Sequence, residues 1–343
     1  MPPNPPPAKK GPSPQGQGPQ RSAPLLAVLD LGTNNCRLLI ARPDRADGFK
    51  VVDSFSRIVR LGEGVAATGL LSDLAMDRTI AALKVCAARI AKHRVVHVLA
   101  VATQAARLAA NRDVLIRRAE AEAGIALSVI SAQQEADLAA LGCAPLIGRK
   151  YKGALIFDIG GGSTEIIHLR RRAGSAGRGE AADEFETLLS ASVPVGVVTL
   201  AETDAASGRG HAAFEAMRKA MREQFSPFAG GFDPSTEHLL GTSGTVTTLA
   251  AIAMKLPRYN RARVDASWHH TASLTKVVDR IARLDVPALA KIGPIGPERA
   301  DLMLAGSAIF AAICSLWPST MLRVADRGLR EGMLRQMRQE LQT

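Results

Sequence analysis

Two stretches of the chain share one pattern of apolar and polar positions. In each, an apolar run typical of a buried strand reaches an aspartate and a glycine, passes through small polar residues, and resumes as a β-prone run. The stretches cover residues 26–40 and 154–168, and Asp30 and Asp158 occupy equivalent places in them. Each stretch predicts a hairpin. Because the motif occurs twice, we expect two related halves that face each other across a cleft.

The rest of the chain alternates between the periodicities of strands and helices. Further strands are predicted at 49–54, 95–103, 126–131 and 321–325, and from Phe185 and His238 onward. Further helices are predicted from an N-cap at Ser72, at 111–123, 133–142, 211–224, 271–284 and 298–316, and from Arg327 onward. The run at 95–103 is continuously apolar, which predicts a strand buried on both faces. Three strands followed by alternating helices and strands indicate an α/β fold.

This order suggests how the chain divides into domains. We expect a first domain at 25–143, a second at 144–325 and a basic C-terminal helix at 326–343, with Leu329, Met333 and Met337 on one side. Residues 1–24 contain nine of the 19 prolines and no acidic residue. Such a composition cannot bury enough apolar surface to offset the entropy of ordering, so this segment is predicted to be a disordered tail.

The glycine turns have the composition of phosphate-binding sites. Gly160, Gly161 and Gly162 carry no Cβ, so their backbone N–H groups can crowd around an anion, and Ser163 and Thr164 add hydroxyl donors. An aspartate at the end of the preceding strand can hold a hydrated divalent cation against a phosphate. A third turn, with Gly241, Ser243 and Gly244, opens a helix whose N-terminal N–H groups can also receive phosphate.

Glu135 is the candidate for chemistry between the two hairpins. It falls in the first turn of the helix predicted at 133–142, just after a strand, where catalytic residues of such sheets tend to lie. A solvated glutamate favoured by the helix dipole explains the same position equally well. The residue pattern alone leaves both interpretations open.

Composition limits the class of protein. The 343 residues are 47% hydrophobic and only 4% aromatic, which suits one large or two medium domains with aliphatic cores. No apolar run is long enough for a membrane span and the N-terminus has no apolar signal region, so we expect a cytoplasmic protein. The four cysteines, at positions 36, 86, 143 and 314, form no CxxC pair and are expected to be buried, reduced thiols.

The net charge of +11 favours an anionic partner. Nucleic acid, nucleotides and inorganic polyphosphate all meet that requirement. With two Trp and two Tyr, the chain lacks the aromatic and basic interleaving that stacks single-stranded bases, so no nucleic-acid partner is expected. The arginines at 170–172 and 178 suit a route for a long anion, and those of the C-terminal helix could attract phosphate, but solvated surfaces are the favoured interpretation for both groups. His93 and His97 have metal-like spacing without a third ligand and are interpreted as structural.

Six segments resemble the family of exopolyphosphatases and guanosine pentaphosphate phosphohydrolases, within the superfold of acetate kinase, actin and sugar kinases. They are DLGTNNCRLLI from Asp30, ATQAARLAAN from Ala102, VISAQQEADLAALG from Val129, FDIGGGSTEI from Phe157, GTSGTVTTLAA from Gly241 and ADRGLREGMLRQM from Ala325. They follow the order of the family and span about residues 25 to 338. The resemblance implies the short form of the family, with two similar actin-like domains and an inter-domain cleft.

The resemblance also implies roles for individual residues. It implies that Glu135 orients or deprotonates the attacking water and that Arg107 neutralises the transferred phosphate. It implies that Asp30 and Asp158 hold Mg²⁺ through its waters. The positions implied to grip the terminal phosphates are Asn34, Gly161, Gly162, Ser163 and Thr164. Three positions depart from the family pattern: Gln134 and Asp137 replace a glutamate and an arginine, and Asn35 replaces a serine.

Four functions follow as hypotheses. The first is a Mg²⁺-dependent exopolyphosphatase that removes terminal orthophosphate from polyphosphate. Hydrolysis of guanosine pentaphosphate at the same site is a close alternative that the sequence does not separate from it. A superfold kinase or ATPase fits less well, and a polyphosphate or alarmone sensor without turnover is motivated by the altered residues around Glu135. The resemblance further implies a homodimer and leaves room for other divalent metals and for K⁺.

Overall fold

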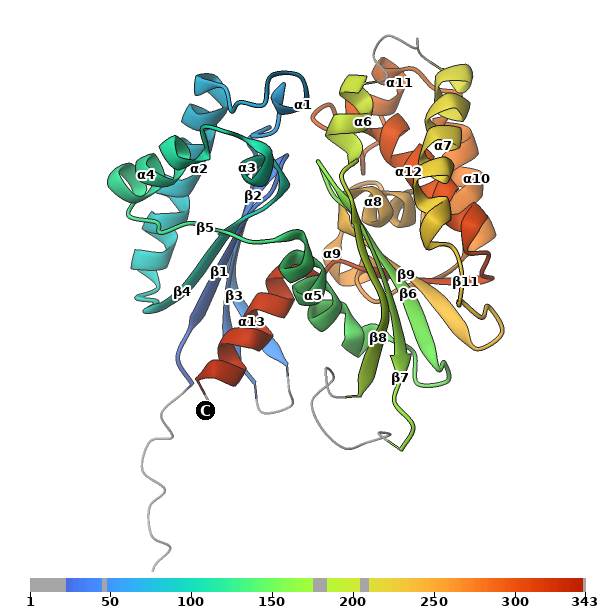
Figure 1. Ribbon diagram of the computed structural model, residues 1–343, viewed down its shortest axis with the longest axis horizontal. Coiled ribbons are helices and arrows are strands. Elements are labelled where there is room, and N and C mark those ends of the chain that lie inside the picture. Colours follow the sequence, from blue (N-terminus) through green and yellow to red (C-terminus); the bar gives the residue numbers. More distant parts are fainter. Residues whose placement is uncertain (1–22, 45–47, 175–183, 204–209, 342–343) are drawn as a thin grey trace, which may run out of the picture.

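The computed structural model describes residues 23–44, 48–174, 184–203 and 210–341. These residues form two lobes, each built on a mixed β-sheet, with two helices packed between the sheets (Figure 1). The predicted α/β class and the pair of related halves are confirmed. Residues 1–22 of the predicted tail and Arg178 of the predicted arginine loop lie outside the described residues.

The first lobe has a five-stranded sheet in the order β3-β2-β1-β4-β5. Its strands are β1 (Leu26–Leu31), β2 (Asn35–Pro43), β3 (Phe49–Ile58), β4 (His97–Ala102) and β5 (Ser128–Val129). Its helices are α1 (Val65–Thr68), α2 (Asp73–Lys92), α3 (Gln104–Leu108) and α4 (Arg112–Ala123). Strand β1 is antiparallel to β2 and parallel to β4. Helices α2 and α4 cover the outer face, where aliphatic side chains from strands and helices form a buried core (Figure 1).

The second lobe repeats this topology with one additional strand. Its sheet runs β10-β11-β9-β6-β7-β8, so a hairpin and third strand are again followed by parallel neighbours. The strands are β6 (Gly153–Ile159), β7 (Thr164–Arg171), β8 (Phe185–Val193), β9 (Glu237–Thr242), β10 (Trp268–His270) and β11 (Met321–Ala325). The helices are α6 (Val197–Thr203), α7 (His211–Phe225), α8 (Ser243–Ala253), α9 (Arg261–Val264), α10 (Thr271–Ile281), α11 (Val286–Ala290) and α12 (Met303–Leu316).

The two helices between the sheets are α5 (Ala132–Cys143) and α13 (Leu329–Glu340) (Figure 1). Helix α5 packs its apolar side against the second sheet, whereas α13 packs against β1 and β2 of the first sheet. Leu329, Met333 and Met337 are buried in that contact, which confirms the predicted apolar side of the C-terminal helix. The C-terminal segment therefore belongs to the packing of the first lobe, although it follows the second lobe in sequence.

Glycines allow α5 and α13 to cross in direct contact. A Cβ built on Gly332 would lie 1.8 Å from the carbonyl oxygen of Leu138, and one on Gly142 would lie 2.0 Å from that of Gly328. No side chain fits at these distances, so the close crossing depends on both glycines. The crossing fixes the start of α5, which carries Glu135, relative to the start of α13.

Several predicted elements differ in extent from the structure: β3 continues beyond the predicted 49–54 to Ile58, and α10 ends at Ile281 rather than at residue 284. Strand β5 contains only two residues of the predicted 126–131, because it pairs with β4 only at Val101 and Ala102. The first half of β4 therefore lies at a sheet edge, and Val98 is 40% exposed, so the expected burial on both faces holds only for Ala100–Ala102. Helix α12 begins at Met303 rather than at residue 298, because Ala300–Leu302 form a 3-10 turn.

Several surface predictions can also be placed. The described residues include no helix that is both long and apolar enough to span a membrane. All four cysteines are free, and the Sγ atoms of Cys36 and Cys86 lie 4.0 Å apart in the first lobe. Arg170 and Arg171 form ion pairs with Glu237 and Glu184 of their own lobe. Glu237 is buried and Arg171 is half-buried, so the interpretation as a solvated surface holds only in part for this segment.

Candidate active site

The two hairpin turns are built in the same way. In the first, the N–H of Gly32 donates to the carbonyl of Asn35 at 2.9 Å, and in the second the N–H of Gly160 donates to the carbonyl of Ser163 at 2.9 Å. Asp30 and Asp158 lie one residue before the last residue of β1 and β6, at the same place in each hairpin. The equivalence predicted from the sequence is therefore confirmed.

Hydrogen bonds on the outer side of each turn fix the direction of its peptide groups. The carbonyl of Thr33 accepts from the N–H of Gly62 at 2.9 Å, and the carbonyls of Gly160 and Gly161 accept from the first N–H groups of α6 at 3.0 and 2.8 Å. Because a trans peptide points its N–H opposite to its carbonyl, the N–H groups of Asn34, Gly161 and Gly162 face the other way. Among the described residues these N–H groups have no hydrogen-bond partner. They are therefore free to bind an anion.

The turns of the two lobes touch each other. A Cβ on Gly162 would lie 2.6 Å from Oγ1 of Thr33 and 3.0 Å from Cγ of Gln104, and a Cβ on Gly161 would lie 3.0 Å from Cβ of Thr33. The glycines of the second turn thus permit close approach of the first lobe as well as anion binding. The expectation that the two hairpins face each other is confirmed.

A cleft of about 460 Å³ lies between the lobes at this contact. The predicted site residues that line it are Asp30, Asn34, Glu135, Asp158, Gly161, Gly162, Ser163 and Gly244. They come from β1, α5, β6, α8 and the two turns. Residues distant in sequence are brought to one cavity because the strand ends of both sheets face each other there.

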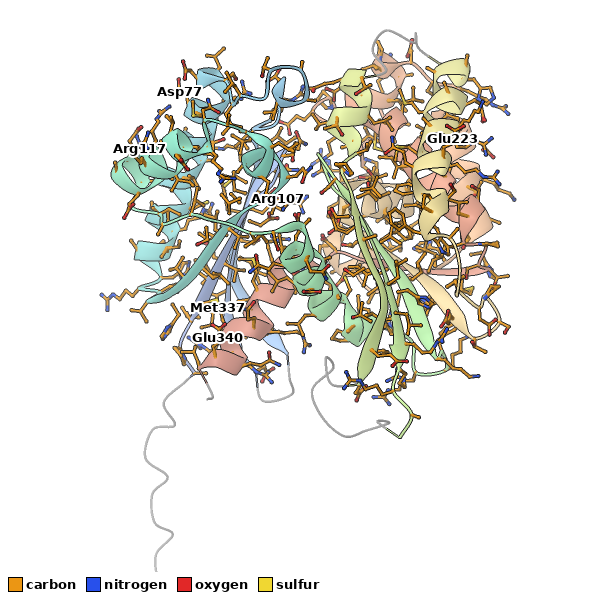
Figure 2. The ribbon with its side chains drawn as sticks, viewed as in Figure 1. Asp77, Arg107, Arg117, Glu223, Met337 and Glu340 are labelled. Carbon is orange, nitrogen blue, oxygen red and sulfur yellow. The ribbon has the colours of Figure 1, made fainter. Side chains whose placement is uncertain are left out.

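Two predicted site residues do not line the cleft. Thr164 is fully buried, and its hydroxyl donates to the carbonyl of Val195 at 2.7 Å, so the structure does not place this side chain where phosphate would bind. Successive strand residues face opposite sides, so Ser163 and Thr164 cannot both face the cleft. Arg107 lies on the side of the first lobe that faces the second (Figure 2), but its guanidinium is bound to Glu135 and Gln104 and is not part of the cleft lining.

Glu135 is held by an ion pair. Nη1 of Arg107 donates to Oε2 of Glu135 at 2.7 Å, and the two side chains are 15% and 13% exposed. Nη1 also donates to the carbonyl of Ile130 at 3.1 Å, while Nε and Nη2 donate to Oε1 of Gln104 at 3.1 and 2.5 Å. With its guanidinium bound at three sites, Arg107 fixes the position of the Glu135 carboxyl.

The first turn of α5 is well defined. Ser131 Oγ accepts from the N–H of Gln134 at 3.1 Å, and Oε1 of Gln134 accepts from the N–H of Ser131 at 2.9 Å, which forms a capping box. Gln134 and Asp137 are exposed and absent from the cleft lining. These two departures from the family pattern therefore lie outside the cavity.

Burial shifts the acids of the cleft toward their neutral forms. The pKa of Glu135 is raised to about 7. Desolvation is the largest cause, Arg107 acts against it, and the charges of Asp30 and Asp158 add to the increase. Desolvation raises the pKa of Asp158 to about 6 and also raises the pKa of Asp30. Such shifts in a cavity are typical of catalytic and cation-binding carboxyls.

Several charged residues of the cleft were not predicted as site residues, among them Arg37, Glu165 and Arg330. Glu165 pairs with Asp158 across β6 and β7, as Arg37 pairs with Asp30 across β1 and β2, and both line the cleft. Glu165 and Arg37 each lie seven residues after the aspartate with which they pair. The register of the hairpins could therefore have predicted both residues. Arg330 of α13 also lines the cleft, and its charge lowers the pKa of Asp30. The prediction of a solvated arginine face on the C-terminal helix is thus wrong for Arg330.

The donor set of the cleft fits a hydrated divalent cation. Among the described residues, no three or more His, Cys, Asp or Glu side chains are close enough to hold a metal directly. Mg²⁺ usually binds through one or two carboxylates together with waters and substrate phosphates, and Asp30 and Asp158 supply such a pair. Oδ1 of Asn34 is buried without a partner in the described structure, as expected for a side chain whose partner is a bound group.

The third glycine turn forms another wall of the cleft. Helix α8 begins at Ser243, directly after β9, and a Cβ built on Gly244 would have only Nη1 of Arg299 within 4 Å, at 3.9 Å. The start of this helix is therefore open toward the cavity, and Arg299 lines the same wall.

Comparisons with known proteins identify the family. The model of the Ppx/GppA phosphatase family matches residues 39–341. Exopolyphosphatase 2 of Mycobacterium tuberculosis is 32% identical over 298 residues, which cover 83% of this chain and 88% of that protein. The guanosine-5'-triphosphate,3'-diphosphate pyrophosphatase of Vibrio parahaemolyticus is 29% identical over 93% of this chain, which spans 60% of that longer protein.

A solved structure gives the same result for the fold. The Aquifex aeolicus member of the Ppx/GppA family superposes with a TM-score of 0.75 at 26% identity, covering 93% of this chain and 99% of that one. The match extends over both lobes of a two-domain protein. The family model, the relatives and the structure agree, and the chain is therefore a member of the Ppx/GppA phosphatase family in its short form.

Proposed function

We propose that this protein is a Mg²⁺-dependent exopolyphosphatase that hydrolyses the terminal phosphoanhydride of inorganic polyphosphate, with Glu135 acting on the attacking water. The observation that carries the proposal is the position of Glu135. Glu135 lines the cleft that the two turns also line, the pKa of its carboxyl is raised to about 7, and Arg107 holds that carboxyl at 2.7 Å. A carboxylate with this pKa is matched to proton abstraction near neutral pH.

The remaining residues would bind the phosphate end. The unpartnered N–H groups of Asn34, Gly161 and Gly162 would receive the phosphoryl oxygens, and the Ser163 hydroxyl lies beside them. Asp30 and Asp158 would hold Mg²⁺ through its waters, and the cation would neutralise charge on the phosphate. Phosphoryl transfer requires positioning and charge neutralisation rather than a covalent intermediate, which suits this arrangement. Arg37 and Arg330 add positive charge to the same cleft.

The polyphosphate substrate is favoured by charge and by one relative. The chain carries a net charge of +11, and the relative of Mycobacterium tuberculosis with 32% identity is called an exopolyphosphatase. The second candidate substrate is guanosine pentaphosphate, because the Vibrio parahaemolyticus relative is named for that reaction. Both substrates would present a phosphoanhydride end to the same turns. The homodimer stays a prediction, and a role for K⁺ stays open.

The deciding experiment combines product analysis with a Glu135 variant. Polyphosphate of defined length should be shortened stepwise with release of orthophosphate in the presence of Mg²⁺. Glu135→Ala should abolish release while circular dichroism and Tm remain those of a folded protein. Gln133→Ala is the matched control, because Gln133 is an exposed neighbour on α5 that does not line the cleft. Normal turnover by Glu135→Ala would refute the assignment.

Parallel assays separate the other candidates. Initial rates on polyphosphate and guanosine pentaphosphate, at equal concentrations of phosphate ends, identify the preferred substrate. Transfer of labelled phosphate from ATP to a small acceptor, without free orthophosphate, would instead indicate a kinase. Tight polyphosphate binding with no phosphate release at any Mg²⁺ concentration would indicate a sensor.

A further inference from the structure

Gln104 is a buried polar residue of the cleft, and none of the roles above uses the NH₂ group of its side chain. It is the first residue of α3, is 7% exposed, and lines the cavity. Its Oε1 accepts two hydrogen bonds from Arg107, from Nε at 3.1 Å and from Nη2 at 2.5 Å. The side chain therefore stands beside the Arg107–Glu135 pair.

The bond to Arg107 determines which way the amide of Gln104 points. A guanidinium has only donors, so the atom of Gln104 that faces it must be the oxygen. The NH₂ group is then turned to the other side of the amide. Within the described part of the chain, no side chain or backbone carbonyl accepts from this NH₂ group, and it is not among the fully buried polar atoms without a partner, so it keeps contact with the solvent of the cleft. A donor that faces a cleft in this way can exchange water for an acceptor on a bound group.

The surroundings of Gln104 identify that group. A Cβ on Gly162 would lie 3.0 Å from Cγ of Gln104, so the side chain touches the second glycine turn. The N–H groups of Gly161 and Gly162, free of partners among the described residues, lie in that turn. We propose that the NH₂ group of Gln104 donates to an oxygen of the terminal phosphoryl group while its Oε1 holds Arg107 against Glu135.

This inference rests on the proposed phosphohydrolase activity and adds a phosphate ligand that also positions the water-activating pair. One side chain would then link three events: closure of the second turn on the first lobe, binding of the phosphate, and orientation of Glu135. Because both ends of the amide are used, substitutions that keep one end and change the other separate the two contributions.

Two variants carry the test. Gln104→Glu keeps an oxygen for Arg107 but replaces the donor with a second oxygen that repels phosphate, and Gln104→Met keeps the length and loses both ends. We expect both variants to lower kcat/KM by about 100-fold, the effect of losing one donor to a developing phosphoryl charge, and Gln104→Glu to raise KM more than Gln104→Met does. Gln133→Met is the matched control and should stay within about twofold of wild type, since surface substitutions rarely matter.

Two outcomes would overturn the inference. Activity of Gln104→Glu within about threefold of wild type would mean that Gln104 only positions Arg107, and wild-type activity of both variants would mean that it has no role. Binding of inorganic phosphate, measured by calorimetry in the presence of Mg²⁺, separates this failure from a failure of the proposed function. If wild type hydrolyses neither substrate, phosphate binding at least about tenfold weaker in Gln104→Glu than in Gln133→Met still supports the ligand role, and equal binding rejects it.

Discussion

Arg107 and Glu135 form an ion pair of 2.7 Å that joins two separate elements at the back of the cleft. Arg107 comes from α3, after the fourth strand of the first sheet, and Glu135 comes from α5, which packs on the second sheet. The pair therefore connects the two lobes and holds the Glu135 side chain in the wall of the cleft. Its electrostatic effect can be tested directly.

Removal of the Arg107 charge should raise the pKa of Glu135. Arg107 is the largest influence that lowers this pKa, so Arg107→Met should move the acidic limb of the kcat/KM profile upward by about one pH unit or more. At pH 7 the activity should fall at least about fivefold, because the ionised fraction of Glu135 drops from about one half to about one tenth. Arg107→Lys keeps the charge without the planar guanidinium and should be intermediate.

Arg117→Met is the control for this comparison. Arg117 lies on the exposed side of α4, away from the cleft (Figure 2), and its removal should leave the pH profile unchanged. An Arg107→Met profile with the same midpoint as wild type, only lower at every pH, would show that Arg107 acts on the substrate and not through Glu135.

The wild-type enzyme should itself lose activity in mild acid. A base must be deprotonated to accept a proton, and desolvation raises the pKa of Glu135 to about 7. The value of kcat/KM should thus rise tenfold per pH unit below a midpoint near 7 and level off above it. Bound Mg²⁺ favours the carboxylate and should move the midpoint downward as its concentration increases. A value of kcat/KM that stays constant from about pH 5 to pH 8 would argue against Glu135 as the general base.

The positions that carry the site were largely predictable from local sequence. The hairpins around Asp30 and Asp158 are recognisable because an apolar run, an acid and glycines occur in a fixed order within fifteen residues. The helix of Glu135 is recognisable because Ser131 and Gln134 form a capping box in front of an apolar pattern. Such patterns depend only on residues that are close in the chain, so they can be recognised without knowledge of the fold.

The residues that were missed depend on packing between distant segments. Arg330 reaches the cleft because α13 returns to the first sheet through a crossing that requires Gly142 and Gly332, so that Arg330 lies near Asp30 although it follows it by 300 residues. No local pattern encodes that return. Gln104 was missed because its proposed role depends on its contacts with Arg107 and with the opposite turn. Helix α3 is also too short for a pattern of apolar and polar positions to predict it. The burial of the Thr164 side chain could have been expected, since Thr164 and Glu165 are successive residues of β7 and Glu165 lines the cleft.

Gly162→Ala should disrupt contact between the lobes more than it disrupts folding. Its methyl group would meet Oγ1 of Thr33 at 2.6 Å and Cγ of Gln104 at 3.0 Å, so the turns must separate or shift. Overpacking of this kind costs about 1–3 kcal/mol, and here it would act mainly on closure. We expect kcat/KM to fall at least about 30-fold, since small misplacements at a reacting centre are costly, and small-angle scattering to show a larger radius of gyration.

A compensating substitution tests this cause. Thr33→Ala removes the Oγ1 that the new methyl group would meet, so the double variant should recover part of the compactness lost in Gly162→Ala. Recovery of compactness without recovery of activity would indicate that the Thr33 hydroxyl also serves the reaction. Gly162→Ala with wild-type activity and radius would contradict the proposed role of the contact.

Asp158 should destabilise the metal-free protein at neutral pH. Its pKa is raised from 3.8 to about 6 by burial, so the folded state binds a proton more tightly than the unfolded state does. The resulting stabilisation is complete below about pH 4 and is lost as pH rises through 6. Above that range, removal of the charge by Asp158→Asn should raise the free energy of unfolding by an amount on the order of 3 kcal/mol.

The measurement is Tm by calorimetry in EDTA at about pH 5 and pH 8, with Asp137→Asn as the control because Asp137 is exposed on α5. The Tm of Asp158→Asn should exceed that of wild type at the higher pH, and the difference should shrink at the lower pH. Addition of Mg²⁺ should raise the Tm of wild type and not that of the variant, because the carboxylate that is costly in the empty cleft is the one that favours the cation. If Asp158→Asn instead lowers Tm at both pH values, the Asp158 carboxylate stabilises the fold without metal. The presence of an aspartate at this position would then not be explained by cation binding.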